Sequence, residues 1–341
     1  MEEKMKQLIE ELVKYADTYY MGRPDISDKE YDRLYDELVE LEKETGIIYP
    51  DSPTQTVGSK AVGTRKKVRH EYPALSLAKT KDIGDIIKVF AKAEEEITSG
   101  CRGMGEILMW KLDGSTVQLT YDDGQLILAA TRGNGEIGLD ITDNASYIKG
   151  IPMAIDHRGK LTVRGEAVMS YREFDRVNAS LPANEEQYTH PRNLATATLT
   201  LPAEQKFRGR EICFFAFDLV HIEDGPDETP EKFPWPYGPG APGKFLDSFE
   251  ERLLWLQEQG FQTVPYAGVT TYNMEMIAKR WGDQPEVFEY PVDGLVIAHE
   301  ARKYATAQPG TAHNPNVLCG YALKWQDETV QTRLRSIVPI R

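Results

Sequence analysis

The chain has 341 residues, 40% of them hydrophobic, and a formal net charge of −14, so it is long enough for two or three compact units with buried cores. This acidic balance argues against a large nucleic-acid surface built from these residues alone, because duplex binding depends on Lys and Arg contacts to phosphates. The sequence has no membrane-length apolar run or signal peptide, and its three cysteines lack CxxC spacing, which predicts a soluble, cytoplasmic protein without structural zinc and without a membrane partner.

The first fifty residues predict a small helical module. Two helices are expected within residues 5–46, separated by a Gly-Arg-Pro-Asp turn at 22–25. The second helix begins with a capping box of Ser27 and Glu30, and apolar side chains then recur at helical spacing: Tyr31, Leu34, Tyr35, Leu38 and Leu41. An extended stretch at 49–54 predicts a linker after this module. A third helix is expected at 83–97, with one apolar face made by Ile86, Ile87, Phe90 and Ala93.

From about residue 106 the pattern changes to short strands. Apolar side chains alternate at 117–121 and again at 126–128, on either side of an Asp-Asp-Gly turn, which is typical of a hairpin. Further strands are expected at 161–169, 212–220, 295–299 and 321–325. Many strands with few helices between them favour an α+β fold with antiparallel sheets. Residues 225–243 contain six prolines and predict a surface insertion.

A Lys-Leu-Asp-Gly motif at 111–114 stands at the end of one apolar strand, just before the hairpin. Alone it is a weak signal, because a surface lysine entering a turn has the same pattern. The functional alternative is a covalent nucleophile at Lys111, which requires an amine that can be neutral when it meets an electrophilic phosphorus. Nearby cations, a bound metal or partial burial would lower the pKa of such an amine.

Downstream residues supply the other groups that nucleotidyl transfer needs. Arg132 lies on a Gly-rich loop, where a guanidinium can bind phosphate or stack on a base. Glu166 stands on a predicted strand, suited to a ribose hydroxyl or a metal-bound water, and Asp293 opens another strand as a candidate carboxylate near a metal. Lys324 ends a strand as a second cation for phosphate. Each residue taken singly also fits an ordinary turn or a solvated strand position.

Taken in order, these segments resemble the bacterial NAD-dependent DNA ligases over nearly the whole chain. Tyr19-Tyr20 and the stretches at 26–34 and 50–55 look like the small helical domain that recognises the nicotinamide mononucleotide half of NAD. ATP-dependent ligases and capping enzymes lack that domain, so it decides the cofactor. The stretches at 68–71 and 75–77 resemble the following linker and the entry to the adenine pocket, and Arg192 matches another family motif.

The resemblance implies a helical domain at 1–65, a nucleotidyltransferase (adenylation) domain with antiparallel sheets and an ATP-grasp-like fold at 66–326, and the first strand of an oligonucleotide-binding barrel or a tail at 327–341. It implies that Lys111 attacks the AMP phosphorus of NAD with the help of Mg²⁺, leaving AMP on the lysine. The catalytic residues would be Lys111, Asp113, Arg132 and Lys324, and the ligands of Mg²⁺ would be Asp113, Glu166 and Asp293. The residues binding NAD would be Tyr19, Tyr20, Asp28, Tyr31, Asp32, Ser76, Leu77, Met109, Lys111, Arg132, Glu166, Arg192 and Lys324.

Several positions depart from the family pattern. Met109 stands where the family usually has a glutamate that reads the adenine, and Thr200 and Ala298 replace a phosphate-binding arginine and a lysine. Pro285 appears at the position of one more arginine, and the Phe-Asp-Leu stretch at 217–219 is closer to ATP-dependent ligases. Loss of these cations should weaken charge compensation at a pyrophosphate by several kcal/mol.

Two functions therefore remain open. The first is self-adenylation by NAD, with nicked DNA as the acceptor in a complete ligase of replication and repair. The second is a non-catalytic or altered-acceptor relative that binds a nucleotide, an alternative that Met109, Thr200 and Ala298 favour. A helix-core role for Tyr31 and Tyr35 also remains open, because both lie on the periodic face. The chain lacks the family's complete barrel, zinc-finger, helix-hairpin-helix and BRCT regions, so we expect a monomer that seals nicked DNA poorly on its own.

Overall fold

The structure is a computed structural model that describes residues 2–20, 25–26, 28–47, 49, 52–54, 65–96, 105–182, 187–202, 207, 209–223, 248–285, 288–310 and 314–325. The predicted insertion at 225–243 and the predicted tail at 327–341 lie outside these ranges. None of the helices within the described ranges is long and apolar enough to span a membrane.

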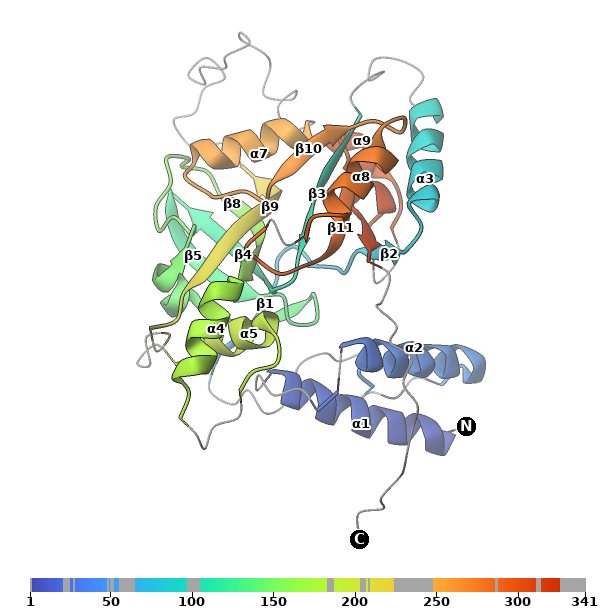
Figure 1. The fold of residues 1–341 in the computed structure, drawn as a ribbon, viewed down its shortest axis with the longest axis vertical. Coiled ribbons are helices and arrows are strands. Elements are labelled where there is room, and N and C mark those ends of the chain that lie inside the picture. The colour runs from blue at the N-terminus through green and yellow to red at the C-terminus, as the bar shows by residue number, and fades with distance from the viewer. Residues whose placement is uncertain are drawn as a thin grey trace.

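Helices α1 (Glu2–Tyr20) and α2 (Asp28–Thr45) form the predicted helical module and pack side by side (Figure 1). Their apolar faces bury a small core, and helical spacing places all of its members on facing stripes: Met5, Leu8, Ile9, Leu12, Leu34 and Leu38. The extended stretch after α2 is held back against it, because Ser52 Oγ and Thr54 Oγ1 each donate to the buried Glu42 carboxylate at 2.6 Å. The helical periodicity seen in the sequence is thus confirmed.

Two five-stranded sheets make up the larger part of the molecule. We call the first the β3 sheet; its order is β10-β3-β11-β12-β2, with the bounds β10 Tyr266–Val269, β3 Glu106–Leu112, β11 Val292–His299, β12 Tyr321–Lys324 and β2 Ala78–Thr80. We call the second the β8 sheet; its order is β5-β4-β8-β9-β7, with the bounds β5 Gln125–Thr131, β4 Ser115–Asp122, β8 Leu161–Val168, β9 Ile212–Ile222 and β7 Ile148–Lys149. A short two-stranded ribbon joins β1 (Lys67–Arg69) to β6 (Ile137–Leu139).

Most strand pairs are antiparallel, as the sequence predicted, but β12 pairs with β2 and β7 pairs with β9 in parallel. The β4–β5 hairpin is also confirmed, and Asp123 and Gly124 adopt φ values of 45° and 74° in its turn. Two consecutive residues with positive φ are the mark of the tight turn that matches the twist of a hairpin.

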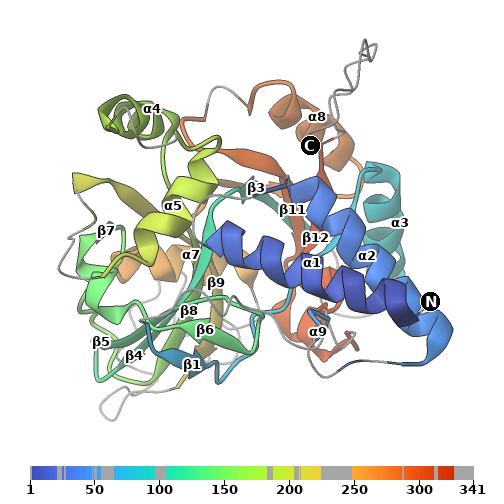
Figure 2. The same ribbon diagram turned by 90° about the horizontal axis from the view of Figure 1, so that it is seen from below.

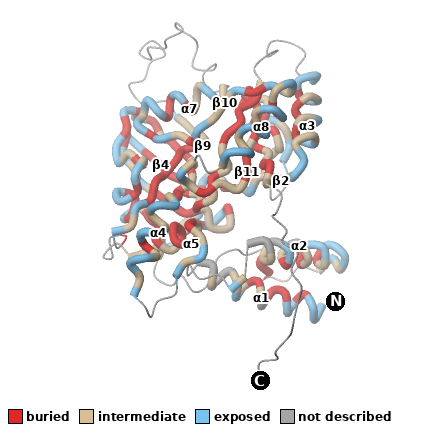
Figure 3. Tube along the Cα trace, in the orientation of Figure 1, coloured by how far each residue is buried: buried red, intermediate tan, exposed pale blue. Residues whose placement is uncertain are grey.

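Helices cover the outer faces of both sheets, and the two sheets face each other (Figure 1). The outer face of the β3 sheet packs against α3 (Ile83–Glu96) and α8 (Met274–Gly282). The outer face of the β8 sheet packs against α5 (Pro191–Leu199) and α7 (Phe249–Glu258), with α4 (Tyr171–Ser180) beside α5. A third apolar cluster fills the space between the sheets, with side chains from β3, β8, β9 and β11. Buried residues accordingly follow the strands of both sheets (Figure 3).

The sequence predicts few helices among the strands, whereas the structure contains α4, α5, α7 and α8 there. Helix α5 illustrates why such helices are hard to recognise. Its sequence, PRNLATATL, contains three threonine or asparagine residues with weak helix propensity. Its start is nevertheless well specified, because His190 accepts from the Arg192 amide and Pro191 occupies the first turn. The α1 helix lies against α5, and the C-terminal end of α1 is the end nearest to α5 (Figure 2).

Candidate active site

Lys111, at the end of β3, forms an ion pair that crosses three adjacent strands. Its Nζ lies 2.8 Å from Asp293 Oδ1 on β11, and Lys324 Nζ on β12 lies 3.2 Å from Asp293 Oδ2. Strand β11 pairs with both β3 and β12, and Gly294 stands opposite Lys111 on one side and Lys324 on the other. A side chain at Gly294 would collide with the Leu323 carbonyl, so glycine allows this close approach. One carboxylate therefore holds both lysine amines.

Two lysines control the ionisation of Asp293. Burial by itself opposes the charged form, but the neighbouring ammonium groups of Lys111 and Lys324 outweigh it, and the pKa of Asp293 lies below its ordinary value. Asp293 is thus ionised at neutral pH. Ion pairs of this kind, partly removed from water, are stronger than those on the surface.

Asp113 of the lysine motif is bound from α5. Arg192 Nη1 lies 3.1 Å from Asp113 Oδ1, and His190 Nε2 lies 3.8 Å from Asp113 Oδ2. The turn itself is fixed by a hydrogen bond from the Asp113 amide to the Pro291 carbonyl at 2.8 Å. A Cβ at Gly114 would overlap the Ala167 carbonyl, which explains why glycine completes the motif. The N-terminal end of α5 therefore sets the position of Asp113, two residues after Lys111.

Glu166 lies on β8 directly opposite Thr116 on β4, and Thr116 Oγ1 donates to Glu166 Oε2 at 2.9 Å. Burial raises the pKa of Glu166 to about 7, although this hydrogen bond and the positive charges of Lys111, Arg192 and Arg132 act in the opposite direction. A half-buried carboxyl whose pKa lies near neutral pH and which is surrounded by cations is typical of an active site.

Arg132 comes directly after β5, and its loop meets the segment around Ser76. Arg132 Nη1 donates to Ser76 Oγ at 3.4 Å, and the Asn314 amide donates to the Ser76 carbonyl at 2.6 Å. His70 supports the loop from behind, because its Nε2 lies 3.1 Å from the carbonyl oxygens of both Thr131 and Arg132. Segments far apart in the sequence thus form one side of the site.

The structure brings eight of the predicted residues into one cluster through these contacts and through the charges that act on Glu166: Ser76, Lys111, Asp113, Arg132, Glu166, Arg192, Asp293 and Lys324. Leu77 lies close to Gly320, just before β12. The side chains of Tyr19, Tyr20, Asp28 and Asp32 lie outside the described residues. Tyr31 stacks on Tyr35 at 6.4 Å, and both pack against the helical core, as the helix-core alternative expects.

Two of the positions that depart from the family lie together in the core between the sheets. Met109 is 4% exposed and Ala298 is fully buried, and both belong to the same apolar cluster. Met109 stands opposite Val296 and Ala298 stands opposite Ile107, so the two residues are diagonal neighbours on one face of paired strands. The positions where the resemblance predicts a glutamate and a lysine therefore hold two apolar side chains of one buried cluster.

Thr200 ends α5, and its Oγ1 lies 3.2 Å from the carbonyls of Thr196 and Ala197. Arg65 has its guanidinium beside this residue, but backbone carbonyls and Asp143 engage it. The expected phosphate-binding cation is therefore absent from position 200 and is not replaced by Arg65. At Pro285, the structure offers no account of the substitution.

The carboxylates expected to bind Mg²⁺ are occupied by other partners. Asp293 binds two lysines, Asp113 binds Arg192, and Glu166 accepts from Thr116. Within the part of the chain that the structure describes, no three His, Cys, Asp or Glu side chains are grouped closely enough to hold a metal ion. This donor set fits a Mg²⁺ ion bound mainly through substrate phosphates with one or two carboxylates, which is how proteins commonly hold it.

Three residues that contribute to this arrangement were not singled out in the sequence. Thr116 and His190 touch Glu166 and Asp113, and Arg65 contacts the end of α5. Thr116 carried a usable signal, because it follows the lysine motif by two residues on the next strand. His190 stands in the His-Pro-Arg-Asn stretch that carries Arg192, whereas Arg65 is recognisable only from tertiary contacts.

A lysine amine, a paired carboxylate and several cations in one cluster are the groups that a covalent nucleotidyltransferase needs. Residues 63–326 match the family described as "NAD-dependent DNA ligase adenylation domain", and residues 1–58 match "DNA ligase-like, N-terminal NAD+-binding domain". The chain belongs to the NAD-dependent DNA ligase family.

Relatives named DNA ligase cover almost all of this chain. The DNA ligase of Ruminiclostridium cellulolyticum is 36% identical over 334 residues, which are 98% of this chain and 46% of the relative. The DNA ligase of Lachnoclostridium phytofermentans is 35% identical over 339 residues, again 98% of this chain and 47% of the relative. The chain thus spans about half the length of the relatives it matches. Among solved structures, mycobacterial DNA ligase D complexed with ATP and MES is 14% identical, with a TM-score of 0.35 over 65% of this chain and 55% of that one.

Proposed function

We propose that this chain charges itself with AMP from NAD, with Lys111 as the nucleophile. The observation that carries the proposal is the Lys111 amine, 2.8 Å from Asp293, within a group of charges that also acts on Glu166. A lysine at the surface of a turn would not share a half-buried carboxylate with a second lysine. The division into a helical domain at 1–65 and an adenylation domain at 66–326 is part of this proposal.

The reaction forms one bond and breaks one. The Lys111 amine loses a proton to Asp293 or to solvent and attacks the AMP phosphorus of NAD. The P–N bond forms as the P–O bond of the pyrophosphate breaks, and nicotinamide mononucleotide leaves with the electron pair on its phosphate oxygen. Release of the Lys111–Asp293 ion pair must precede attack, because an ammonium group has no lone pair.

The remaining groups stabilise charge and position the nucleotide. Lys324, Arg132 and Arg192 offer positive charge to the phosphates as the leaving group departs. Glu166 is placed to accept a hydrogen bond from a ribose hydroxyl, and Ser76 and Leu77 lie beside the base. Met109, which the resemblance places at the adenine, would contribute an apolar contact at the base from the edge of the core between the sheets. In the helical module, Tyr19, Tyr20, Asp28, Tyr31 and Asp32 would bind the nicotinamide nucleotide by stacking and hydrogen bonds.

The carboxylates of Asp113, Glu166 and Asp293 are those that would hold Mg²⁺ together with the phosphates of NAD. The ion would supply charge compensation at the pyrophosphate. In a complete ligase, the AMP would pass to the 5′-phosphate of nicked DNA in replication and repair. We propose that this chain by itself joins nicks weakly, acts as a monomer and works in the cytoplasm.

Intact-mass spectrometry tests the proposal directly. Incubation of the protein with NAD and Mg²⁺ should add the mass of one AMP to the wild-type chain. The gain should be absent in Lys111→Ala, absent when ATP replaces NAD, and retained in Lys88→Ala, which removes an exposed lysine on α3. A wild-type chain that binds NAD without any gain in mass would instead support a non-catalytic nucleotide-binding relative.

A further inference from the structure

Thr116 contacts two separate parts of the site. It lies on β4, two residues after the lysine motif ends at Gly114. Its Oγ1 donates to Glu166 Oε2 at 2.9 Å, and its backbone carbonyl accepts from the Arg132 amide at 2.9 Å. Thr116 stands directly opposite Glu166 in the β4–β8 register, so the two side chains share one face of the sheet. The hydroxyl is therefore held by a strand pair and not by a loop.

The two oxygens of the Glu166 carboxyl have different surroundings. Oε2 accepts from the Thr116 hydroxyl, whereas Oε1 accepts no hydrogen bond from the described part of the chain. The positive charges of Lys111, Arg192 and Arg132 act on this carboxyl, so it faces the cluster around the proposed nucleophile. One oxygen is thus fixed by the protein, and the other is left for a donor from a ligand.

The fixed oxygen restrains a side chain that is otherwise flexible. Glutamate has several rotatable torsions, whereas threonine is branched at Cβ and stiff at χ1. Thr116 is held at its backbone by the Arg132 amide and at its side by the strand pair, so its hydroxyl is a rigid donor. A group that must bind a ligand in one geometry works best when neighbouring hydrogen bonds fix its rotamer.

We infer that Thr116 is a positioning residue for sugar recognition, because its hydroxyl holds Oε2 of Glu166 and so presents Oε1 to a hydroxyl of the adenosine ribose of NAD. The inference rests on the proposed function, in which Glu166 accepts from that ribose. A carboxyl that is already oriented loses less conformational freedom on binding. A nucleotide without the hydroxyl leaves Oε1 without a donor, so the site discriminates against deoxyribose.

Calorimetry with AMP, 2′-deoxy-AMP and 3′-deoxy-AMP tests this role on full-length protein whose intact mass shows no attached AMP. These probes carry no leaving group on phosphorus, so Lys111 stays in place and no transfer occurs. The wild-type chain should bind at least one deoxy nucleotide roughly tenfold or more weakly than AMP, because a charged acceptor loses its donor.

Thr116→Val replaces the hydroxyl by a methyl group of similar size. It should reduce this ratio of affinities at least about threefold by weakening AMP, and leave that deoxy nucleotide within about twofold of wild type. Thr116→Ser keeps the hydroxyl and should recover most of the wild-type ratio. In the charging reaction, Thr116→Val should raise the KM for NAD and leave the rate at saturating NAD within about twofold. The KM values for NAD and its deoxyadenosine analogues give the same ratios independently.

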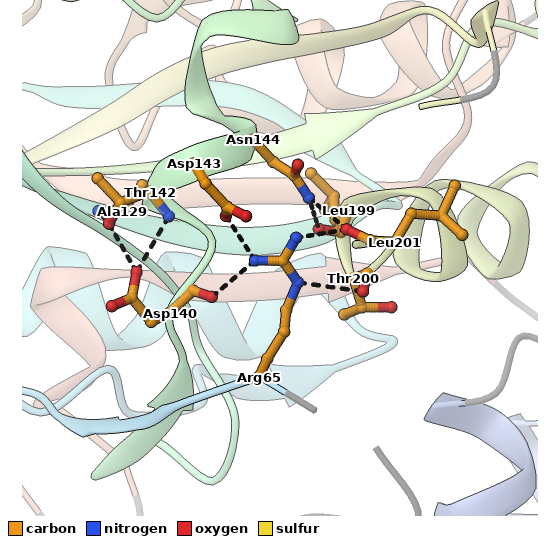
Figure 4. A network of polar contacts seen from close by, with 9 residues as sticks. All are labelled: Arg65, Ala129, Asp140, Thr142, Asp143, Asn144, Leu199, Thr200 and Leu201. Atoms are coloured by element: carbon orange, nitrogen blue, oxygen red, sulfur yellow. Dashed lines mark hydrogen bonds and ion pairs between the residues drawn. The ribbon is translucent and has the colours of Figure 1, made fainter. Parts of the chain in front are cut away.

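Thr142→Val is the matched control, because Thr142 makes an equivalent threonine–carboxylate pair outside the cluster of site residues (Figure 4). Thr142 Oγ1 donates to Asp140 Oδ1 at 2.7 Å and accepts from the Ala129 amide at 3.0 Å. Its loss should lower the melting temperature without changing the ratio of AMP to deoxy-AMP affinity. A purely structural role of Thr116 would give the same pattern as this control.

Three results would overturn the inference. They are equal binding of AMP and both deoxy nucleotides by the wild-type chain, an unchanged ratio in Thr116→Val, and an equal change of the ratio in Thr142→Val. If Thr116→Val does not fold, Thr116→Ala takes its place with the same expectations. Any of the three results in a wild-type chain that gains AMP from NAD leaves the proposed function standing, and the inference alone fails. A wild-type chain that neither binds AMP nor gains it from NAD overturns both.

Discussion

Glu166 is the residue of the site whose ionisation depends most visibly on the fold. Its pKa is raised from 4.5 to about 7, first by burial, while Thr116 and the nearby cations limit the rise. Asp293 is also half-buried but has a lowered pKa, because two lysines contact it. Direct contact with a cation therefore decides which of the two carboxyls is ionised at neutral pH.

The raised pKa of Glu166 makes a prediction about stability and pH. Between about pH 4.5 and about 7, the unfolded chain releases the Glu166 proton while the folded chain retains it, so the free energy of unfolding falls as pH rises. Glu166→Gln should remove the contribution of Glu166 to this fall in the free energy of unfolding, which is on the order of 2 kcal/mol after allowance for partial exposure. Denaturant unfolding of the ligand-free proteins at pH 4.5 and pH 8 measures it. Identical pH dependence in the two proteins would refute the prediction.

At the scale of elements, the β3–β11 pair carries both the proposed nucleophile and two positions that depart from the pattern the resemblance predicts. Lys111 and Met109 lie on β3, and Asp293 and Ala298 lie on β11. The end of the strand pair near Lys111 is polar, whereas the part around Met109 belongs to the core between the sheets. Where the resemblance predicts a glutamate and a lysine, Met109 and Ala298 instead belong to apolar packing between the sheets.

This pairing can be tested by a double-mutant cycle. Met109→Glu places a carboxylate in an apolar core and should destabilise the protein by about 2 kcal/mol or more. Ala298→Lys supplies a diagonal partner for this carboxylate. The loss of unfolding free energy in the double variant should therefore be smaller than the summed losses of the two single variants by at least about 0.5 kcal/mol. Met109→Leu, which conserves volume, should cost less than about 1.5 kcal/mol. Urea unfolding of Met109→Glu, Ala298→Lys, the double variant and Met109→Leu gives the four changes in unfolding free energy. Strictly additive effects of the first two substitutions would contradict the coupling.

At the scale of the whole molecule, a buried ion pair joins the two sheets. Arg302, at the start of α9 (Arg302–Ala307), has Nη2 3.3 Å from Asp218 Oδ1 on β9 and Nη1 3.0 Å from the Cys319 carbonyl. Its guanidinium also lies over the Phe249 ring, 4.8 Å from the centroid. Because α9 follows β11 and Asp218 belongs to the β8 sheet, this pair helps fix how the sheets face each other.

Breaking this pair should cost much more than breaking a surface pair. Arg302→Met removes the ion-pair partner of the partly buried Asp218, and we expect a loss of about 3 kcal/mol in unfolding free energy. Lys92→Met is the control, since Lys92 and Glu96 form an exposed pair on α3, 3.8 Å apart, and it should change stability by less than about 0.5 kcal/mol. Thermal and urea unfolding compare the two. Equal losses in both variants would show that Arg302 does not join the sheets.

The sequence alone determined the elements whose signal is local. Helical spacing predicted α1, α2 and α3, alternation predicted the β4–β5 hairpin, and the motif around Lys111 predicted a nucleophile there before any contact was known. Helix α5 and the parallel strands β2 and β7 were not predicted, because threonine-rich or two- to three-residue segments are too short or too weak in propensity to show a period.

Only the tertiary structure decided which residues act on one another. Lys111 and Asp293 are 182 positions apart, and Arg65 lies 135 positions from Thr200, so nothing in their local sequence specifies these partners. Sheet register and helix packing bring them together, and these depend on burial of apolar surface contributed by the whole chain. The same packing gives Glu166 and Asp293 opposite pKa shifts, because desolvation and charge contacts exist only after folding.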